Sequence, residues 1–402
     1  MREFLLKNGI RAVYKKNEET PRIAVTIDMS INDEEKLAGV HSLMTRLLLQ
    51  GTKQYDGIEL AKALDENGIE LIADMKQDYL RFRLLCLNED FEKAVELLED
   101  IIKNSTFNEF DKEKVKMKGE LVAELDSARL KVSDEFVKTV YENHYYGHTY
   151  TNILKSLSEI TRDDVVSAYK NIIESSKKVI SVVGAIDEDL VINLVCKKFE
   201  DLPNSDNVLK NYKKPCLNAP KQTEVIKEDA KQAQILKGWL IPTFKHPDYP
   251  VMLVINTILG ASGLSSRLFR ELREKKGLAY TVRTSCEVKE LAAVFSIYIA
   301  TEPSNIDTCL KGFEEEIDKI KKNPVSQEEL RNAKNNIFGK HQFIIETNFQ
   351  QATSLAYYGI NDLPFNYYDI MEEKINGVTP EQVKDCANKY FTENSVITIL
   401  HP

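Results

Sequence analysis

The chain is 402 residues long, with 43% hydrophobic and 29% charged residues, a composition typical of a soluble globular protein. This length exceeds one ordinary hydrophobic core and predicts two large domains. A net charge of −9 repels nucleic-acid phosphate. Short basic runs such as Lys213-Lys214 and Lys275-Lys276 are interleaved with acids, so nucleic acid is not an expected partner.

Membrane insertion and disulfide bonding are not expected either. No stretch reaches the roughly 18 consecutive apolar residues of a membrane span, and the N-terminus lacks the pattern of a signal peptide. We therefore expect a cytoplasmic protein. The cysteines are scattered singly, without a Cys-x-x-Cys pair, and are expected to be reduced and mostly buried. They are Cys86, Cys196, Cys216, Cys286, Cys309 and Cys386.

The first predicted strand alternates through Ile23, Val25, Ile27 and Met29, which predicts one packed face and one exposed face. Further along, an apolar stripe at helical spacing predicts a helix over residues 91–102. Strand and helix signals in one segment indicate an α+β domain.

The second half of the chain repeats these events in the same order. A helix capped by Thr161 precedes a β-rich run at residues 179–184, and a helix capped by Thr379, with Pro380 in its first turn, precedes a similar run at residues 396–400. The helix at 91–102 is echoed at residues 306–320. Each echo falls about 215 residues downstream, which predicts two copies of one domain.

The copies are separated by a polar segment that carries Pro215 and Pro220 and has neither helical nor strand periodicity. We therefore predict an N-terminal domain at residues 1–203, a linker at 204–222 and a C-terminal domain at 223–402. Two unrelated α+β domains with similar endings are the alternative.

The run EEKLAGVHSLMTRLLLQGT, residues 34–52, resembles the signature segment of the insulinase/pitrilysin family of zinc peptidases. In that family the helix carries the inverted motif His-x-x-Glu-His, in which two histidines one turn apart bind zinc and the glutamate activates the metal-bound water. Counting back from the Gly-Thr end places Ser42, Thr45 and Arg46 at these positions. None can take its role, because a hydroxyl is a poor zinc ligand or base and a guanidinium has no lone pair to give.

Other metal ligands do not rescue the motif. Shifting the frame to His41 puts Met44 and Thr45 where Glu and His are needed. The family's third ligand is a glutamate further along, near Glu120 or Glu124, and one carboxylate does not make a catalytic zinc site. A second pair, His144 and His148, is separated by a glycine that indicates a helix end, so these are read as ordinary histidines. No metal site is expected in this chain.

The second half keeps the family's other signature. Residues 259–280, LGASGLSSRLFRELREKKGLAY, resemble the C-terminal segment of the family, in which an arginine is followed by a tyrosine seven positions later. The resemblance implies that Arg273 holds a substrate carbonyl and that Tyr280 donates to the oxyanion of the tetrahedral intermediate. It also implies that the preceding loop faces substrate. Its residues are Gly260, Ser262, Gly263 and Ser265. This loop lacks the Lys-Ser/Thr of a phosphate-binding loop.

The resemblance covers essentially the whole chain and implies two homologous α+β domains, each a mostly antiparallel sheet with helices on one face. The family includes short half-enzymes of the mitochondrial-processing-peptidase type, in which one chain binds zinc and the other supplies the Arg/Tyr pair. The sequence fits the second chain, and we expect a heterodimer with a homologous His-x-x-Glu-His subunit, which holds the zinc, and peptide substrates. The alternative is a scaffold protein without a role in proteolysis. An independent enzyme with another nucleophile has no Ser-His-Asp or Cys-His signature.

Overall fold

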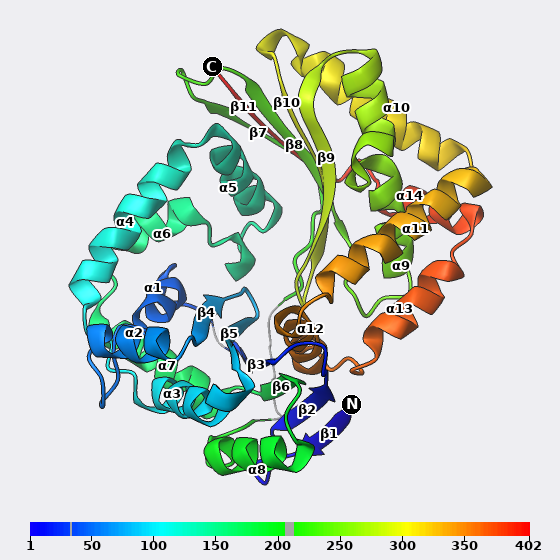
Figure 1. The fold of residues 1–402 in the computed structure, drawn as a ribbon. Coiled ribbons are helices and arrows are strands. Elements are labelled where there is room, and N and C mark those ends of the chain that lie inside the picture. The colour runs from blue at the N-terminus through cyan, green and yellow to red at the C-terminus, as the bar shows by residue number, and fades with distance from the viewer. Residues whose placement is uncertain (33, 206–212) are drawn as a thin grey trace. The chain divides into compact units, whose positions relative to one another are not determined.

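The computed structural model describes residues 1–32, 34–205 and 213–402, which form two compact units (Figure 1). Unit 1 comprises Met1–Glu120, Asn152–Tyr212 and Gln342–Tyr367. Unit 2 comprises Leu121–Thr151, Lys213–His341 and Tyr368–Pro402. Each unit therefore takes its central segments from one half of the sequence and a short segment from the other half.

Unit 1 is built on a six-stranded sheet of order β1-β2-β6-β3-β5-β4, in which β2 and β6 are parallel and the other neighbours antiparallel. Its strands are β1 (Arg2–Leu5), β2 (Arg11–Lys16), β3 (Arg22–Ser30), β4 (Glu70–Met75), β5 (Tyr79–Leu87) and β6 (Lys178–Gly184). Its helices are α1 (Val40–Leu47), α2 (Gly57–Glu66), α3 (Phe91–Asn104), α6 (Tyr150–Ser156), α7 (Arg162–Ser175), α8 (Glu188–Phe199) and α12 (Asn348–Ile360), and α4 (Phe110–Asp126) runs from unit 1 into unit 2.

Unit 2 is built on a five-stranded sheet of order β7-β11-β8-β10-β9, in which β7 and β11 are parallel. Its strands are β7 (Lys221–Ile226), β8 (Ala233–Ile241), β9 (Ala279–Val288), β10 (Ala293–Thr301) and β11 (Val396–His401). Its helices are α5 (Ala128–Val140), α9 (Tyr249–Asn256), α10 (Ile306–Lys322), α11 (Gln327–Ile344), α13 (Tyr367–Asn376) and α14 (Pro380–Tyr390), with π-helical turns at η3 (Thr257–Ala261) and η5 (Phe269–Lys275).

The predicted repeat is visible in the two sheets. In each, a central strand (β3 or β8) lies between an antiparallel neighbour on one side and the last strand of the copy (β6 or β11) on the other, and that last strand is parallel to an early one. The predicted helices at 91–102 and 306–320 are α3 and α10. Capping boxes at Thr161 and Thr379 start the helices that precede β6 and β11. The predicted α+β fold of two homologous domains is confirmed.

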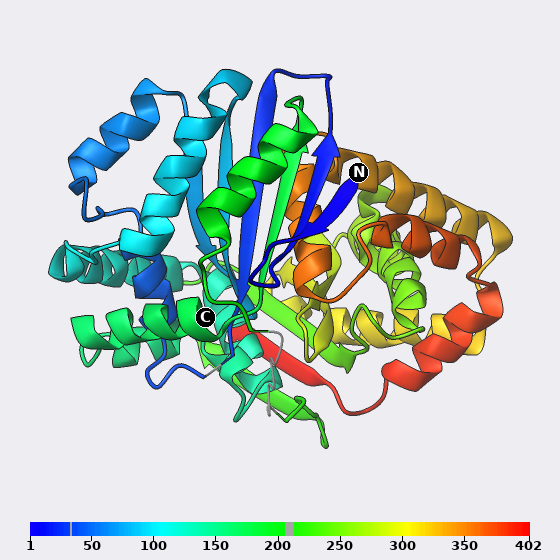
Figure 2. The ribbon, with the colours of Figure 1, turned by 90° about the horizontal axis from the view of Figure 1, so that it is seen from below.

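The prediction that β3 has one exposed face is wrong. Every residue of β3 after Arg22 is buried, because α3 and α7 contact one side of the sheet while α12, from the second half of the sequence, packs along β3 and β6 on the other (Figure 2). Ala24 of β3 and Val179 of β6 form a buried cluster with Ala352 and Leu355 of α12. The alternation of β3 is therefore a pattern of size and polarity within a strand that is buried on both faces.

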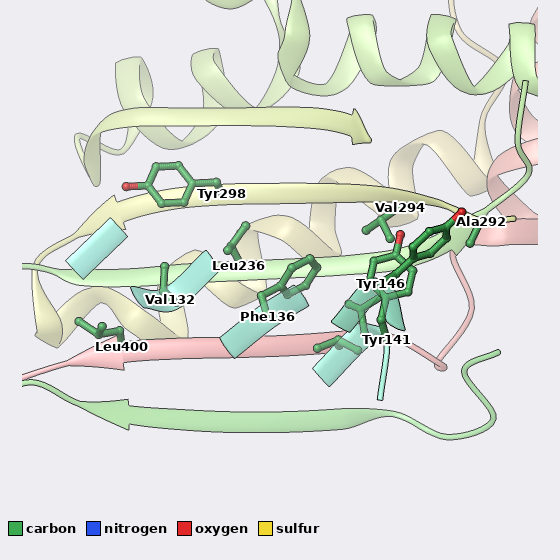
Figure 3. Close-up of a cluster of buried hydrophobic side chains, with 11 residues drawn as sticks. Val132, Phe136, Tyr141, Tyr146, Leu236, Ala292, Val294, Tyr298 and Leu400 are labelled. Atoms are coloured by element: carbon green, nitrogen blue, oxygen red, sulfur yellow. The ribbon is translucent and has the colours of Figure 1, made fainter. Parts of the chain in front are cut away.

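Unit 2 has the reciprocal arrangement. Helix α5, from the first half of the sequence, packs on β8 and β11, and its side chains Val132 and Phe136 lie in a buried cluster with Leu236 and Leu400 (Figure 3). Helices α9, α10 and α14 also contact this sheet. The predicted domains are continuous stretches of sequence on either side of the linker. The compact units differ from them because Gln342–Tyr367 belongs to unit 1 and Leu121–Thr151 belongs to unit 2. Part of the predicted linker, 206–212, lies outside the described residues.

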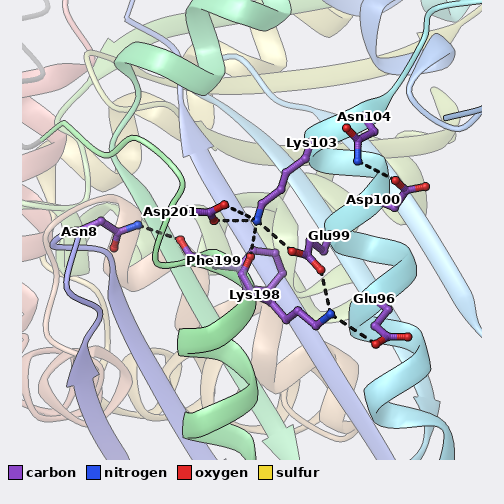
Figure 4. Close-up of polar contacts among 9 residues, drawn as sticks. All are labelled: Asn8, Glu96, Glu99, Asp100, Lys103, Asn104, Lys198, Phe199 and Asp201. Atoms are coloured by element: carbon purple, nitrogen blue, oxygen red, sulfur yellow. Dashed lines mark hydrogen bonds and ion pairs between the residues drawn. The ribbon is translucent and has the colours of Figure 1, made fainter. Parts of the chain in front are cut away.

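Lysines hold α3 and α8 together in unit 1 (Figure 4). The ammonium of Lys103 donates to Glu99, to Asp201 and to the carbonyl of Lys198, and the Lys198 ammonium lies 3.1 Å from Glu99 and 3.4 Å from Glu96. Lys103, Glu99 and Lys198 are largely shielded from solvent, whereas Glu96 and Asp201 at the edges of the network are exposed.

No helix among the described residues has the length and apolarity needed to cross a membrane.

All six cysteines are free. Cys86, Cys309 and Cys386 are buried, Cys196 and Cys286 are half-buried, and Cys216 is exposed.

A buried lysine makes stability depend on pH. Lys178 is 1% exposed, and its ammonium donates to the carbonyls of Ile173, Ser176 and Pro203 at 2.8, 3.1 and 2.6 Å. Burial lowers the pKa of Lys178 to about 8. Between this value and the unfolded pKa of about 10.4 the unfolded chain binds more protons, so the Lys178 contribution to stability rises with pH.

We expect the free energy of unfolding of the wild type, relative to Lys178→Met, to increase by about 1 to 2 kcal/mol between pH 7.5 and pH 9.5. Urea unfolding of both proteins at the two pH values measures this difference, and the variant serves to cancel all other titrations. A difference that stays constant, or falls with pH, would show that the lysine folds in its ordinary charged state.

Candidate functional site

The zinc-motif positions lie on α1, where their side chains make contacts of other kinds. Thr45 is buried, and its hydroxyl donates to the carbonyl of His41 one turn earlier at 2.8 Å. Ser42 is half-buried. Glu35 caps the start of the helix, because its two carboxylate oxygens accept from the amides of Gly39 (3.0 Å) and His41 (2.7 Å).

The carboxylate of Glu35 also contacts the side chain of His41, the one histidine in residues 34–52. The His41 ring is almost completely buried, and its Nδ1 lies 3.3 Å from Oε1 of Glu35. This contact holds the ring at the start of α1. His41, the first position of the frame-shifted motif, is therefore paired with Glu35, and the other two positions of that frame, Met44 and Thr45, are not zinc ligands.

Arg46 lies against Glu120, one of the two glutamates that the resemblance offers as the third metal ligand. Its guanidinium forms an ion pair with Glu120 of α4, and its Nη1 lies 3.9 Å from Oε2 of the buried Glu113 on the same helix. The hydrogen bond from Arg46 lowers the pKa of Glu120. Burial and, after it, the carboxylate of Glu124, the other expected ligand, raise the pKa of Tyr150. A fixed side-chain cation thus neutralises the glutamate that would face a metal ion.

Within residues 1–32, 34–205 and 213–402, no group of three or more His, Cys, Asp or Glu side chains is arranged to hold a metal ion. A zinc ion does not fit this chain, because the α1 positions offer a hydroxyl, a hydroxyl and a guanidinium. The Arg46–Glu120 ion pair was not predicted, although a positive residue at a ligand position and a glutamate at the third-ligand position were both evident in the sequence.

This arrangement predicts that zinc binding can be restored. We expect the triple variant Ser42→His, Thr45→Glu, Arg46→His to bind about one zinc ion per chain, because it rebuilds both histidines and frees Glu120 to complete a three-ligand site. Zinc content after gel filtration, by elemental analysis, measures the effect.

The matched control adds Glu120→Gln to the triple variant and is expected to lose the metal. Zinc retained by that quadruple variant, or absent from the triple one, would show that Glu120 does not face the α1 positions in the way the ion pair indicates.

The Arg/Tyr pair is assembled by a helix-ending turn in unit 2. Turn η5 is followed by Gly277, which has φ +62° and donates its amide to the carbonyl of Arg273 at 3.1 Å, while Leu278 donates its amide to the carbonyl of Leu272 at 2.8 Å. This nested pair of bonds closes the π-helical turn, and glycine suits the position because other residues are strained at positive φ. The chain then enters β9, whose second residue is Tyr280.

The turn brings the two predicted residues into contact. The guanidinium carbon of Arg273 lies 4.5 Å from the centroid of the Tyr280 ring and 4.6 Å from that of Phe269, so the cation contacts two aromatic rings. Tyr280 is 78% exposed. An exposed phenol beside a positioned guanidinium can donate hydrogen bonds to two oxygen atoms of a bound group.

The residues of the small-residue loop differ in their surroundings. A side chain at Gly260 would meet the amide nitrogen of Thr284 at 2.5 Å, so this glycine allows η3 to pack directly on β9. Gly263 has φ +75° and open space around it. Ser262 and Ser265 line a polar cavity of about 690 Å³ within unit 2. Contact of these four residues with substrate remains a prediction.

The loop is fixed at one side by an arginine. Arg267 donates from Nε and Nη2 to the two carboxylate oxygens of Glu329 on α11, at 2.8 and 2.6 Å. Such a bidentate pair has a defined geometry, so it sets the position of the chain between the loop and η5.

Two family models match the chain. Residues 11–154 match the model of insulinase (peptidase family M16), and residues 159–337 match the model of the peptidase M16 inactive domain. Together the two models account for most of the sequence.

Individual relatives match along nearly their full length. The chain is 25% identical over 411 residues to a Bacillus subtilis protein named uncharacterized zinc protease YmxG, covering 100% of this chain and 98% of that protein. It is 25% identical over 391 residues to the non-peptidase homolog YmxG of Helicobacter pylori, covering 94% and 88%.

Solved structures share the fold. A protease from Helicobacter pylori superimposes with a TM-score of 0.91 at 22% identity, covering 100% of this chain and 99% of that one. A peptidase M16 inactive domain from Pseudomonas fluorescens gives a TM-score of 0.90 at 22% identity, covering 100% and 98%. With both halves of the sequence matched and the metal positions occupied by Ser42, Thr45 and Arg46, the chain is a member of the insulinase family, peptidase family M16, that lacks the family's zinc ligands.

Proposed function

We propose that this chain is the non-catalytic subunit of a heterodimeric zinc metallopeptidase, in which it supplies Arg273 and Tyr280 to a zinc site on a homologous partner. One observation carries the proposal. Tyr280 is exposed and lies against the half-buried Arg273, whereas Thr45 and Arg46 of the zinc motif are engaged in a hydroxyl–carbonyl bond and an ion pair. A chain that has the Arg/Tyr pair but no zinc ligands needs a partner chain that supplies the zinc.

The chemistry of the pair suits peptide hydrolysis. In the reaction, a carbonyl oxygen gains negative charge as water adds to the carbon, and donors placed at that oxygen stabilise the transition state more than the bound peptide. The Tyr280 hydroxyl is the donor to that oxyanion, and the Arg273 fork holds a neighbouring carbonyl of the peptide. The zinc and the attacking water belong to the partner.

The position of β9 supports a peptide as substrate. Strand β9 is at the end of its sheet, so one side of its backbone is not paired within the described chain. A peptide added along such an edge is bound through its backbone and needs no particular side chains. Because Tyr280 is the second residue of this strand, the added peptide would lie beside the hydroxyl.

The test is to purify the chain alone, a His-x-x-Glu-His homologue from the same source alone, and the two together. We expect the two chains to elute as one complex, with zinc and peptide cleavage present in the mixture and absent from this chain. Cleavage by this chain alone at the rate of the mixture would refute the subunit role.

A scaffold role without proteolysis is the second candidate. It is favoured by the name of the Helicobacter pylori relative, non-peptidase homolog, and by the loss of the zinc ligands. It predicts a stable complex in which the partner cleaves peptides equally well whatever residues stand at 273 and 280.

A further inference from the structure

A small pocket in unit 2 combines an apolar floor with a positively charged rim. The pocket has a volume of about 130 Å³ and lies between α5 and the β9–β10 end of the sheet. The strand register aligns Arg283 of β9 with Tyr298 of β10, and Ser285 with Ser296. These side chains point to one face of the sheet, since residues two apart on a strand share a face.

The floor belongs to the buried core under α5. Phe136 and Val140 of α5 meet Leu236 of β8 and Val294 of β10, and all four are at most 6% exposed (Figure 3). A ligand that reaches the floor therefore needs an apolar part. The volume corresponds to roughly four water molecules of liquid, so only a short group can enter.

The rim carries two arginines beside one aromatic ring. The guanidinium carbons of Arg129 and Arg283 lie 5.5 and 5.4 Å from the centroid of Tyr298, whose hydroxyl donates to Gln234 at 2.5 Å. Both arginines are exposed at the surface of the unit. The ring therefore contacts two cationic groups that extend from different elements, α5 and β9.

The positive charge of this rim is not neutralised. Within residues 1–32, 34–205 and 213–402, neither Arg129 nor Arg283 has a carboxylate within ion-pair distance, and Glu287, the acid that lines the pocket, accepts from Lys289 at 2.7 Å. Such a pair of arginines suits an anion with planar oxygen geometry, which a guanidinium binds through two parallel hydrogen bonds.

We propose that this pocket binds the C-terminal residue of a peptide, with the α-carboxylate between Arg129 and Arg283 and an apolar side chain on the floor. The inference rests on the proposed function only in taking a peptide as the ligand. Arg283 lies three residues after Tyr280 on β9, roughly 10 Å along an extended strand.

Binding by the chain alone tests this proposal without a partner or turnover. Two fluorescent hexapeptides that end in leucine differ only in a C-terminal carboxylate or carboxamide, and a third carries the carboxamide and an aspartate in place of the leucine. We expect anisotropy titration to show the free acid binding about tenfold or more tighter than its amide, since charge-assisted hydrogen bonds carry this difference. Equal affinity of acid and amide would overturn the proposal, and tight binding of the aspartyl amide would overturn the assignment to a chain terminus.

Substitution locates the site. The double variant Arg129→Gln, Arg283→Gln is expected to bind the free acid with the affinity of the amide, and the double lysine variant is expected to recover part of the difference, because lysine keeps the charge but loses the fork. Arg331→Gln removes an exposed charge of the same unit on α11 and should have no effect. Undiminished preference for the acid in the double glutamine variant would place the carboxylate site elsewhere. A chain that passes these tests but supports no hydrolysis with its partner would refute the proposed function and leave this pocket assignment standing.

Discussion

In the complex with a zinc-binding partner, Tyr280→Phe and Arg273→Ala are each expected to lower peptide turnover by about a hundredfold or more. The phenylalanine keeps the ring against which Arg273 packs and removes only the donor, so it isolates the hydroxyl. Arg273→Ala removes the donor fork and the cation that contacts Phe269 and Tyr280. Initial rates of cleavage of a quenched fluorescent peptide, over a range of concentrations, measure kcat and KM separately.

The separate effects on kcat and KM distinguish transition-state stabilisation from peptide binding. Loss of an interaction made only in the transition state lowers kcat and kcat/KM together, whereas loss of simple peptide binding raises KM. We expect the first pattern for Tyr280→Phe. Arg331→Ala and Tyr150→Phe are matched controls with the same type of substitution outside the pair. Rates unchanged in both Arg273 and Tyr280 variants would favour the scaffold role.

Replacing Arg81 with methionine is expected to destabilise unit 1 by about 3 to 5 kcal/mol. Arg81 of β5 is aligned with Asp28 of β3, and it donates from Nε and Nη2 to the two carboxylate oxygens at 2.7 and 2.6 Å. Asp28 is 0% exposed, so the variant leaves a carboxylate buried without its counter-ion. Far-UV circular dichroism during urea unfolding gives the free energy of unfolding.

The control replaces both charges. Asp28→Leu together with Arg81→Met removes the buried carboxylate as well and is expected to recover most of the loss, because a well-packed apolar pair avoids the desolvation cost. Trp239, the single tryptophan, lies in unit 2 and is 3% exposed, so its fluorescence follows that unit separately. A loss below about 1 kcal/mol in Arg81→Met would mean that water or another cation reaches Asp28.

Local signals in the sequence predicted local structure. Thr161 and Thr379 each stand before a helix with a hydrogen-bonding side chain three residues on, and both form the expected capping boxes. The second covered face of β3 was missed because its cover, α12, lies more than 300 residues further along the chain. No periodicity within a strand records which distant helix packs on it.

In the candidate site, too, some features follow from the residue types and others depend on how distant elements pack. That Ser42, Thr45 and Arg46 cannot bind zinc follows from residue types, which the sequence states directly. The ion pair of Arg46 with Glu120 depends on how α1 and α4 pack, which residue types do not state. The contact of Arg273 with Tyr280 lies between these cases, since Gly277 indicates the turn but only the structure gives the ring-to-cation distance of 4.5 Å.

The exchange of α12 into unit 1 has a consequence for synthesis of the chain. When residue 205 has been translated, all six strands of the first sheet exist, but α12, which covers Ala24 and Val179, is encoded some 150 residues later. At roughly 5–20 residues per second this interval lasts on the order of 10–30 s. Throughout that time a nascent polypeptide carries an uncovered apolar sheet face, the kind of surface that a ribosome-associated chaperone binds.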